Sequence, residues 1–168
     1  VNFSLPDSVE RIEKFAFGGT DIEKIINASN VFIEGNRAIL ISNNSKLMFI
    51  ENDAFETEEW SIDTTTNKLS EVFLPKELRL REASYNFTLG KYLSDITIDE
   101  GHPYIAFNHN MLYANPQMNK LVRALPKATE SNVMDIALAE YTTNVYDFAF
   151  YNCETIKKII FGSSMVEY

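Results

Sequence analysis

The sequence predicts a strand-dominated repeat solenoid of the α+β class, with short parallel strands, short helical turns and inserted β-hairpins. Three observations lead to this prediction. One segment recurs without a gap near the two ends of the chain, a Leu-x-x-Ile-x-Ile pattern recurs in variant forms along the chain, and a broken apolar segment occurs twice. Such internal repeats are typical of stacked structural units, each of which covers the apolar side of its neighbour.

The gapless repeat pairs residues 5–17 with residues 138–150. Both segments begin with Leu, carry a β-branched apolar residue in the middle and end in Phe-Ala-Phe. We expect the small central Ala to let the neighbouring coil come close, while the Phe rings fill the interior. Residues 12–17 are expected to form a short helical or 3₁₀ turn that Gly18 and Gly19 end.

The Leu-x-x-Ile-x-Ile pattern spaces apolar residues three and then two positions apart. The two-residue step is that of a strand with its apolar side chains on one face. One such turn cannot bury its apolar side alone, whereas stacked turns can if each strand pairs with the next coil. We therefore expect a single continuous inward ladder formed by Ile22, Ile25, Leu69, Val72, Leu74, Leu93, Ile96, Ile98, Ile156, Ile159 and Phe161.

Two further segments, at about residues 31–50 and 104–125, contain apolar runs broken by Gly, Asn or Pro. Such breaks indicate tight turns between short strands, so each segment is expected to form a β-hairpin or small sheet that projects from the solenoid. The expected domain is a single solenoid, residues 1–168, with modules at about 1–68 and 69–137 and a partial third module at 138–168.

The net charge of −9 argues against nucleic acid or an anionic membrane as the main partner. No apolar run approaches the ~20 residues of a membrane helix, so no direct membrane insertion is expected. The chain starts at Val1 without an initiator Met, and we expect it to be part of a longer protein. Cys153 is the single cysteine, so no disulfide framework or cysteine-based zinc site is expected, and the thiol is assigned to packing.

No catalytic, cofactor or metal site is expected, and the chain is not expected to be an enzyme. His102 and His109 have too few carboxylates nearby in the sequence for a metal site. Glu56, Glu58 and Glu59 are interpreted as a solvated charge cluster, because nothing indicates a cleft that would raise the pKa of one of them. The chain has no Gly-x-Ser-x-Gly nucleophile elbow and no phosphate-binding Gly-rich loop.

The candidate binding surface combines the strand positions that should point outward with two aromatic residues. Tyr and Trp are favoured at interfaces because they bury area and keep a polar end. Phe73 and Ile160 would be exposed apolar residues, which indicates either a binding strip or cover by a flanking insert. The candidate residues are Lys24, Glu71, Phe73, Asp95, Thr97, Lys157, Lys158, Ile160, Tyr104 and Trp60.

These patterns resemble the BspA-like leucine-rich repeat family. Its repeat has a Leu-Pro opening, an apolar turn ending in Ala-Phe, a Gly-Cys or Gly-Thr pair, and Leu-x-x-Ile-x-Ile. The matching residues are Leu5-Pro6, Phe15-Ala16-Phe17, Gly19-Thr20, Phe148-Ala149-Phe150 and Tyr151-Asn152-Cys153, with Asn152 in place of the usual Gly. The resemblance covers most of the chain and is weak at residues 51–68, 76–86 and 127–137.

The resemblance implies a leucine-rich-repeat solenoid and a non-catalytic role. Members of the family are mostly surface or secreted proteins of host-associated bacteria and protists, linked to adhesion. The resemblance therefore implies an extracellular or cell-surface location. It also implies binding to a protein or glycan ligand, host-derived ligands included. We expect no cofactor and a monomer. Two alternatives remain open: a structural spacer or stalk in a larger surface protein, and an accessory non-catalytic domain of a secreted enzyme.

Overall fold

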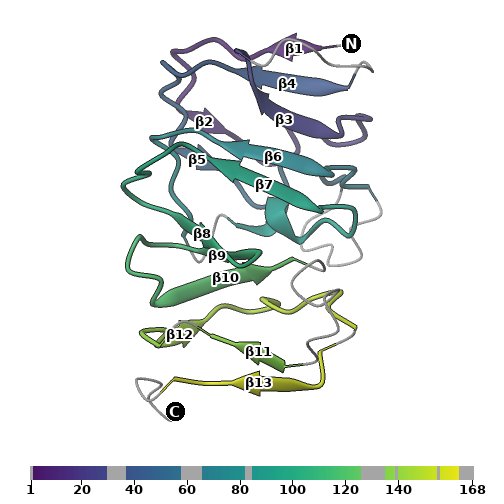
Figure 1. Ribbon diagram of the computed structural model, residues 1–168. Helices are drawn as coiled ribbons and strands as arrows, with labels where there is room; N and C mark the ends of the chain where they lie inside the picture. Colours follow the sequence, from purple (N-terminus) through teal and green to yellow (C-terminus); the bar gives the residue numbers. More distant parts are fainter. Residues whose placement is uncertain are drawn as a thin grey trace.

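The computed structural model describes residues 2–29, 37–57, 66–81, 85–125, 135–138, 140–154 and 156–162. Over these ranges the chain forms thirteen short strands and one 3₁₀ turn, η1 (Asn86–Leu89), and no α-helix. The strands stack along one axis from the N-terminal to the C-terminal end of the molecule (Figure 1). The strand-dominated repeat fold is thus present, whereas the α+β class is not confirmed. No helix in the described ranges is long and apolar enough to cross a membrane.

The main sheet has five strands in the order β1-β4-β3-β6-β7, and every pairing in it is parallel. Its strands are β1 (Phe3–Ser4), β4 (Ala38–Ile41), β3 (Lys24–Asn27), β6 (Glu71–Leu74) and β7 (Asp95–Ile98). One row across the sheet joins Ile39, Ile25, Val72 and Ile96 in register, and all four side chains are buried. This row is the inward apolar ladder on which the coils stack.

Most of the predicted ladder residues face the interior. The buried ones are Ile25, Leu69, Val72, Leu74, Leu93 and Ile96. The half-buried ones, which pack against the apolar clusters, are Ile22, Ile98, Ile156 and Ile159. The prediction is wrong for Phe161, which is 53% exposed because it follows the last described strand, β13 (Lys158–Ile160), with no described coil beyond it.

The prediction of a hairpin at residues 31–50 is wrong for the part that the structure describes. β4 inserts between β1 and β3 as a parallel strand, and β5 (Phe49–Ile50) pairs in parallel with β2 (Arg11–Ile12). The physical reason is the continuous apolar run of β4, since parallel strands covered on both faces take such runs. Residues 30–36 of this segment lie outside the described residues.

The second predicted hairpin segment contains an antiparallel meander of β8 (Ala106–Asn108), β9 (Met111–Tyr113) and β10 (Lys120–Ala124). His109 and Asn110 connect the first two strands with φ of 49° and 58°. Positive φ at both central residues is the requirement of a type I′ hairpin turn. Two parallel pairings complete the C-terminal part: β12 (Asn144–Val145) with β10, and β11 (Asp135–Ala137) with β13.

The two Phe-Ala-Phe segments fold alike but are not helical. Phe15 and Phe148, the first Phe of each copy, have the same left-handed φ of 60°, so the expected helical or 3₁₀ turn at residues 12–17 is wrong. Both first Phe side chains are exposed, whereas the second ones, Phe17 and Phe150, pack against the apolar clusters. The positive φ redirects the chain between the two rings, so only one ring of each pair fills the interior.

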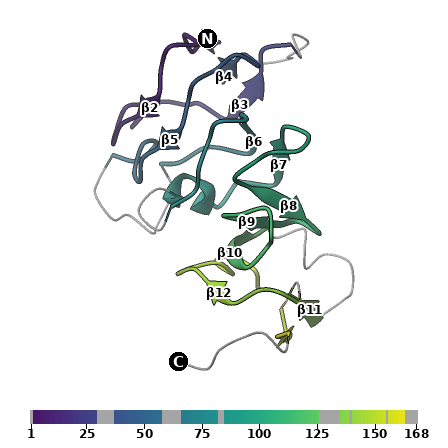
Figure 2. The ribbon, with the colours of Figure 1, turned by 90° about the vertical axis from the view of Figure 1, so that its left-hand side faces the viewer.

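The expected continuous ladder is divided into two apolar clusters by the meander. Leu112 and Val122 belong to the first cluster, which holds the coils of the main sheet. Met111, Tyr113 and Leu121 belong to the second cluster, together with the C-terminal coils. Because successive side chains of a strand point to opposite faces, β9 and β10 serve as a wall shared by both clusters. Figure 2 shows these strands between the upper and lower parts of the molecule.

Candidate functional site

The outward face of the main sheet carries a charged row formed by Lys24, Glu71 and Asp95. These residues are Cα partners on β3, β6 and β7, so the structure brings them side by side. The Nζ of Lys24 lies 3.1 Å from Oε2 of Glu71, and the two side chains are 37% and 38% exposed. The hydroxyl of Ser94 donates to Oδ2 of Asp95 at 2.8 Å. Ion pairs this exposed contribute about 0.2–1 kcal/mol, so the row adds little to stability.

The next outward row pairs Phe73 with Thr97. Thr97 is exposed as predicted, but the prediction of an exposed Phe73 is wrong, because Phe73 is only 5% exposed and belongs to the first apolar cluster. Two alternatives were open for an outward apolar residue, an exposed binding strip or a covered side chain. The structure shows a covered side chain at Phe73. The run Val-Phe-Leu of β6 is apolar on both faces, which is the pattern of a strand buried on both sides.

The other candidate residues do not join this face. Lys157, Lys158 and Ile160 are exposed, and the exposed fraction of Ile160 is 42%. Lys158 and Ile160 belong to β13. That strand pairs with β11 in a separate two-stranded sheet at the C-terminal end (Figure 1). Tyr104 is half-buried on a different flank, beside Arg79. Trp60 lies outside the described residues.

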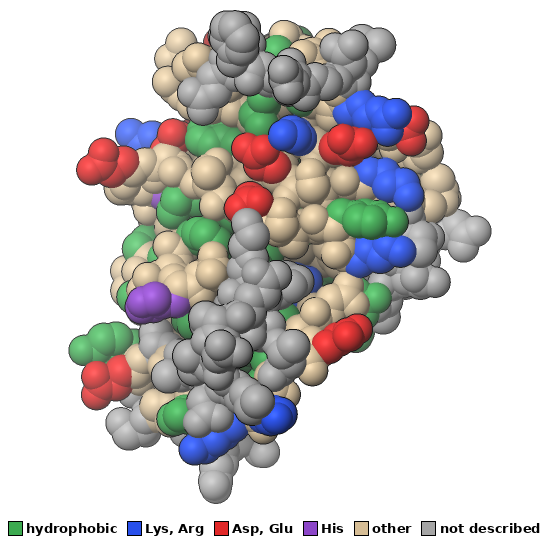
Figure 3. Space-filling view, turned by 45° about the vertical axis from the view of Figure 1, so that its right-hand side comes forward, with side chains coloured by type: hydrophobic (Ala, Val, Ile, Leu, Met, Phe, Trp, Pro, Cys, Tyr) green, Lys and Arg blue, Asp and Glu red, His purple; other side chains and the backbone are tan. Residues whose placement is uncertain are grey.

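The described surface mixes both signs of charge. Figure 3 shows acidic and basic side chains interspersed with hydrophobic ones on the face that it presents. Such a surface keeps a protein dispersed and offers local charge patterns rather than one large field of a single sign.

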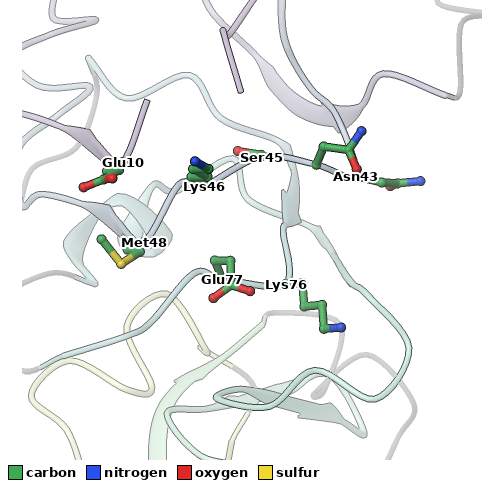
Figure 4. Close-up of a pocket in the computed structure, with 8 residues that line it drawn as sticks. Glu10, Asn43, Ser45, Lys46, Met48, Lys76 and Glu77 are labelled. Atoms are coloured by element: carbon green, nitrogen blue, oxygen red, sulfur yellow. The ribbon is translucent and has the colours of Figure 1, made fainter. Parts of the chain in front are cut away.

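A groove of about 450 Å³ lies where the segments following β4 and β6 pass one another. Figure 4 shows Lys76 and Glu77 on one side, facing Lys46 and Ser45 on the other. Ammonium, carboxylate, amide and hydroxyl groups together give the groove both hydrogen-bond donors and acceptors. Its size is that of a small-ligand site, but its lining is more polar than that of most small-molecule pockets.

Sequence reasoning missed this groove. Its walls come from three separate segments, which contribute Glu10, residues 43–46 with Met48, and Lys76-Glu77. The available signal is that turn formers, Asn43-Asn44-Ser45 in one segment and Pro75 in another, follow closely on an apolar strand. Stacking of the coils then places equivalent turns next to one another.

His102 holds a loop against the preceding coil. Its Nδ1 accepts a hydrogen bond from the backbone N–H of Tyr104 at 3.2 Å, so Nε2 carries the proton and donates to the carbonyl of Pro75 at 2.9 Å. Burial lowers the pKa of the imidazole, against the opposing effects of the Pro75 carbonyl and of Asp99 and Glu77. The neutral ring is therefore a structural link between coils.

Glu56 is a buried carboxyl group between two turns. Burial raises its pKa, the hydrogen bond from Thr66 opposes that rise, and nearby Asp53 adds to it. Oε2 accepts from the hydroxyl of Thr66, whereas Oε1 is buried and has no hydrogen-bond partner among the described residues. Contrary to the prediction of a solvated cluster, this member of the acidic segment lies inside; Glu58 and Glu59 lie outside the described residues.

Arg123 is fully buried on β10, within the wall between the two apolar clusters. Its Nε donates to the carbonyl of Thr88 at 3.2 Å and its Nη1 donates to the carbonyl of Tyr151, while Nη2 has no partner within the part of the chain that the structure describes. Burial lowers the pKa of this guanidinium and raises the pKa of the nearby Cys153 thiol, which donates to the carbonyl of Ala124. Both groups thus join backbone segments of different coils.

No group of three or more His, Cys, Asp or Glu is placed to hold a metal ion in the ranges that the structure describes. The titratable groups with shifted pKa values each contact the backbone or a side chain of a neighbouring segment. The arrangement can present charged and polar side chains on a fixed frame.

Short parallel strands in register, stacked over an aliphatic ladder and closed by equivalent turns, define a leucine-rich-repeat solenoid. The model of the BspA type leucine rich repeat region matches residues 1–119 and 128–168, with six copies. The chain belongs to this family, which confirms the resemblance found in the sequence.

Two solved structures are similar to the chain. A leucine-rich repeat protein from Eubacterium ventriosum has 13% identity and a TM-score of 0.60, over 98% of this chain and 42% of that one. The pneumococcal vaccine antigen PcpA has 14% identity and a TM-score of 0.47, over 98% of this chain and 45% of that one. The chain thus spans less than half the length of either protein, and the first likeness supports the fold alone. No curated protein matches the chain.

Proposed function

We propose that this chain is a non-catalytic binding module of a cell-surface or secreted protein, which presents an extended repeat face to a protein or glycan partner. The observation that carries the proposal is the exposed row of Lys24, Glu71 and Asp95 on three strands in register. Neighbouring strands lie about 4.8 Å apart, so the ladder holds these groups at a fixed spacing. A partner that matches this spacing is bound with little loss of conformational entropy in the module.

The location outside the cell is supported by family membership, since the BspA-like family consists mostly of surface and secreted proteins. A non-catalytic role is supported by the positions of the groups with shifted pKa values. Glu56, His102 and Arg123 lie at joints between coils, where they contact neighbouring segments. The acidic net charge supports a partner other than nucleic acid.

A structural spacer is the second candidate function, and one observation favours it. The charged groups of the row already have partners, because Lys24 pairs with Glu71 and Asp95 accepts from Ser94. A surface whose charges are satisfied within the chain keeps the molecule dispersed without any ligand.

The test is an array of extracellular-matrix proteins and glycans probed with the chain and with the charge-swapped variant Lys24→Glu/Glu71→Lys. The swap keeps the ion pair, so the fold and the stability are expected to be unchanged, while the charges that a partner meets are inverted. We expect at least one ligand to bind the original chain and to bind the swapped variant at least tenfold more weakly. Equal binding by both would remove the row as the contact surface, and no ligand at all would favour the spacer.

A further inference from the structure

A second surface lies on the flank that carries β2 and β5, which faces the viewer in Figure 2. Arginine side chains there stack on aromatic rings from neighbouring coils. The residues of this arginine flank are Arg11, Phe49, Arg79, Arg81 and Tyr104. Three of the five arginines of this acidic chain thus lie on one flank, apart from the charged row of the main sheet.

The register of the coils explains this gathering. Arg11 is the Cα partner of Phe49, and the backbone N–H of Arg79 donates to the carbonyl of Met48 at 2.9 Å, which sets Arg79 beside Phe49. Arg79 and Arg81 flank Leu80, which is buried. Arg81 is exposed, whereas Arg79 is half-buried and its Nε is buried, so the two guanidinium groups reach the surface to different extents.

Stacking fixes the guanidinium groups. The Cζ of Arg81 lies 3.9 Å from the centre of the Phe49 ring, and that of Arg11 lies 4.9 Å from it. The Cζ of Arg79 lies 4.3 Å from the centre of the Tyr104 ring, and its Nη2 donates to the Tyr104 hydroxyl at 3.2 Å. A guanidinium stacked on a ring keeps N–H donors at its edges, where they can meet a carboxylate in the plane of the group.

The charges of two of these arginines are not neutralised within the described part of the chain. Arg11 pairs with Glu51 and lies 3.9 Å from a carboxylate oxygen of Glu13. Neither Arg79 nor Arg81 forms an ion pair with a described residue. The flank therefore offers two positioned cations that have no anionic partner among the described residues.

We propose that Arg79 and Arg81 form a docking site for an extended acidic segment of a partner protein; this inference rests on the proposed binding function and names the chemistry of one partner. Alternate residues of an extended chain lie about 6.6 Å apart. Arg79 and Arg81 are likewise alternate residues of their segment, so we expect carboxylates at alternate positions of the partner to contact the two guanidinium groups.

A protein segment fits this site better than a glycan does. Sugars are commonly held by stacking on an open aromatic face, and here the rings are already covered. Phe49 is only 6% exposed and has two guanidinium groups near its ring, and the Tyr104 ring carries Arg79. The groups left to contact a partner are thus hydrogen-bond donors with positive charge, which match carboxylates of Asp and Glu.

The test uses fluorescence anisotropy of labelled poly-L-glutamate with the full 168-residue chain, alongside heparin and neutral dextran. We expect poly-L-glutamate to bind, more weakly at higher salt, and dextran not to bind. The variant Arg79→Gln/Arg81→Gln is expected to bind about tenfold more weakly, because each exposed charge contact contributes a factor of up to about five. The control Lys157→Gln/Lys158→Gln removes the same charge at the other end of the molecule and is expected to stay within about twofold.

A further variant separates geometry from charge. Arg79→Lys/Arg81→Lys keeps both charges but loses the planar fork, and is expected to bind more weakly than the original chain. Circular dichroism and thermal unfolding check the fold of each variant, and Arg81→Gln alone serves if the double variant unfolds. Equal loss in the two Gln variants, binding of heparin but not of poly-L-glutamate, or no binding of either would overturn the inference. Such a failure would not change the binding that we expect between array ligands and the charged row of the main sheet. The two proposals can therefore be refuted separately.

Discussion

Gly18 lies in the turn after β2, close to the backbone of Glu56 in the turn of the next coil. A Cβ atom at this position would stand well inside 3.0 Å of the carbonyl oxygen of Glu56 and 3.2 Å from its carbonyl carbon. The obstacle is backbone, which cannot rotate away as a side chain can. The substitution Gly18→Ala is therefore expected to push the two turns apart by roughly 1 Å.

The expected loss of stability follows from the contacts that this movement breaks. The N–H of Phe15 donates to the carbonyl of Asp53 at 3.0 Å, and the N–H of Phe17 donates to the carbonyl of Ala54 at 2.8 Å. Each such bond contributes about 1 kcal/mol, and forcing a methyl group into a packed site costs about 1–3 kcal/mol. We expect Gly18→Ala to lower the free energy of unfolding by about 3–5 kcal/mol, or the melting temperature by on the order of 10 °C.

Urea unfolding followed by far-ultraviolet circular dichroism measures this loss, with Gly101→Ala as the matched control. Gly101 has φ of +66°, and a methyl group added there would meet no described atom within 4 Å beyond its own chain neighbours, so its substitution brings only backbone strain. That strain costs about 1–2 kcal/mol. If Gly18→Ala proved no more destabilising than Gly101→Ala, the close approach of the two turns would be refuted.

Two further predictions concern the buried ionisable groups. Burial lowers the folded pKa of His102 below its usual 6.5, so the unfolded state takes up the proton first; stability is full above pH 6.5 and falls as the pH is lowered. His102→Asn is expected to show a smaller drop in melting temperature between about pH 7 and pH 5 than the original chain, and an equal drop would count against this role. Arg123→Met removes the donors to the carbonyls of Thr88 and Tyr151 and is expected to cost about 3 kcal/mol by urea unfolding. An unchanged midpoint would mean that desolvation of the guanidinium offsets both hydrogen bonds.

Much of the fold follows from apolar spacing. The two-residue step identified Ile25, Val72 and Ile96 as inward positions, and the structure places them in one buried row. The same spacing could not show which strands pair. The apolar run of β4 suits both a hairpin and a parallel strand, and its parallel pairing with β1 and β3 depends on segments distant in the sequence.

The candidate surface was predictable only in part. Alternation along a strand places Lys24, Glu71 and Asp95 outward, and coil stacking then aligns them. Alternation also places Phe73 outward, yet Phe73 is buried, because exposure depends on what packs over a strand as well as on its direction. The groove and the arginine flank combine side chains from separate coils, so a local pattern in the sequence cannot show that these side chains meet.

The sequence by itself determined that the chain is a repeat solenoid of the BspA type, because the repeat unit, its Phe-Ala-Phe turns and its apolar ladder are local patterns. The tertiary structure alone decided the order of the strands, the division of the core by the meander, and the pairing of guanidiniums with rings. These features depend on the lateral register of coils distant in the sequence. Register is set by the packing of whole coils against one another, and no single segment contains that information.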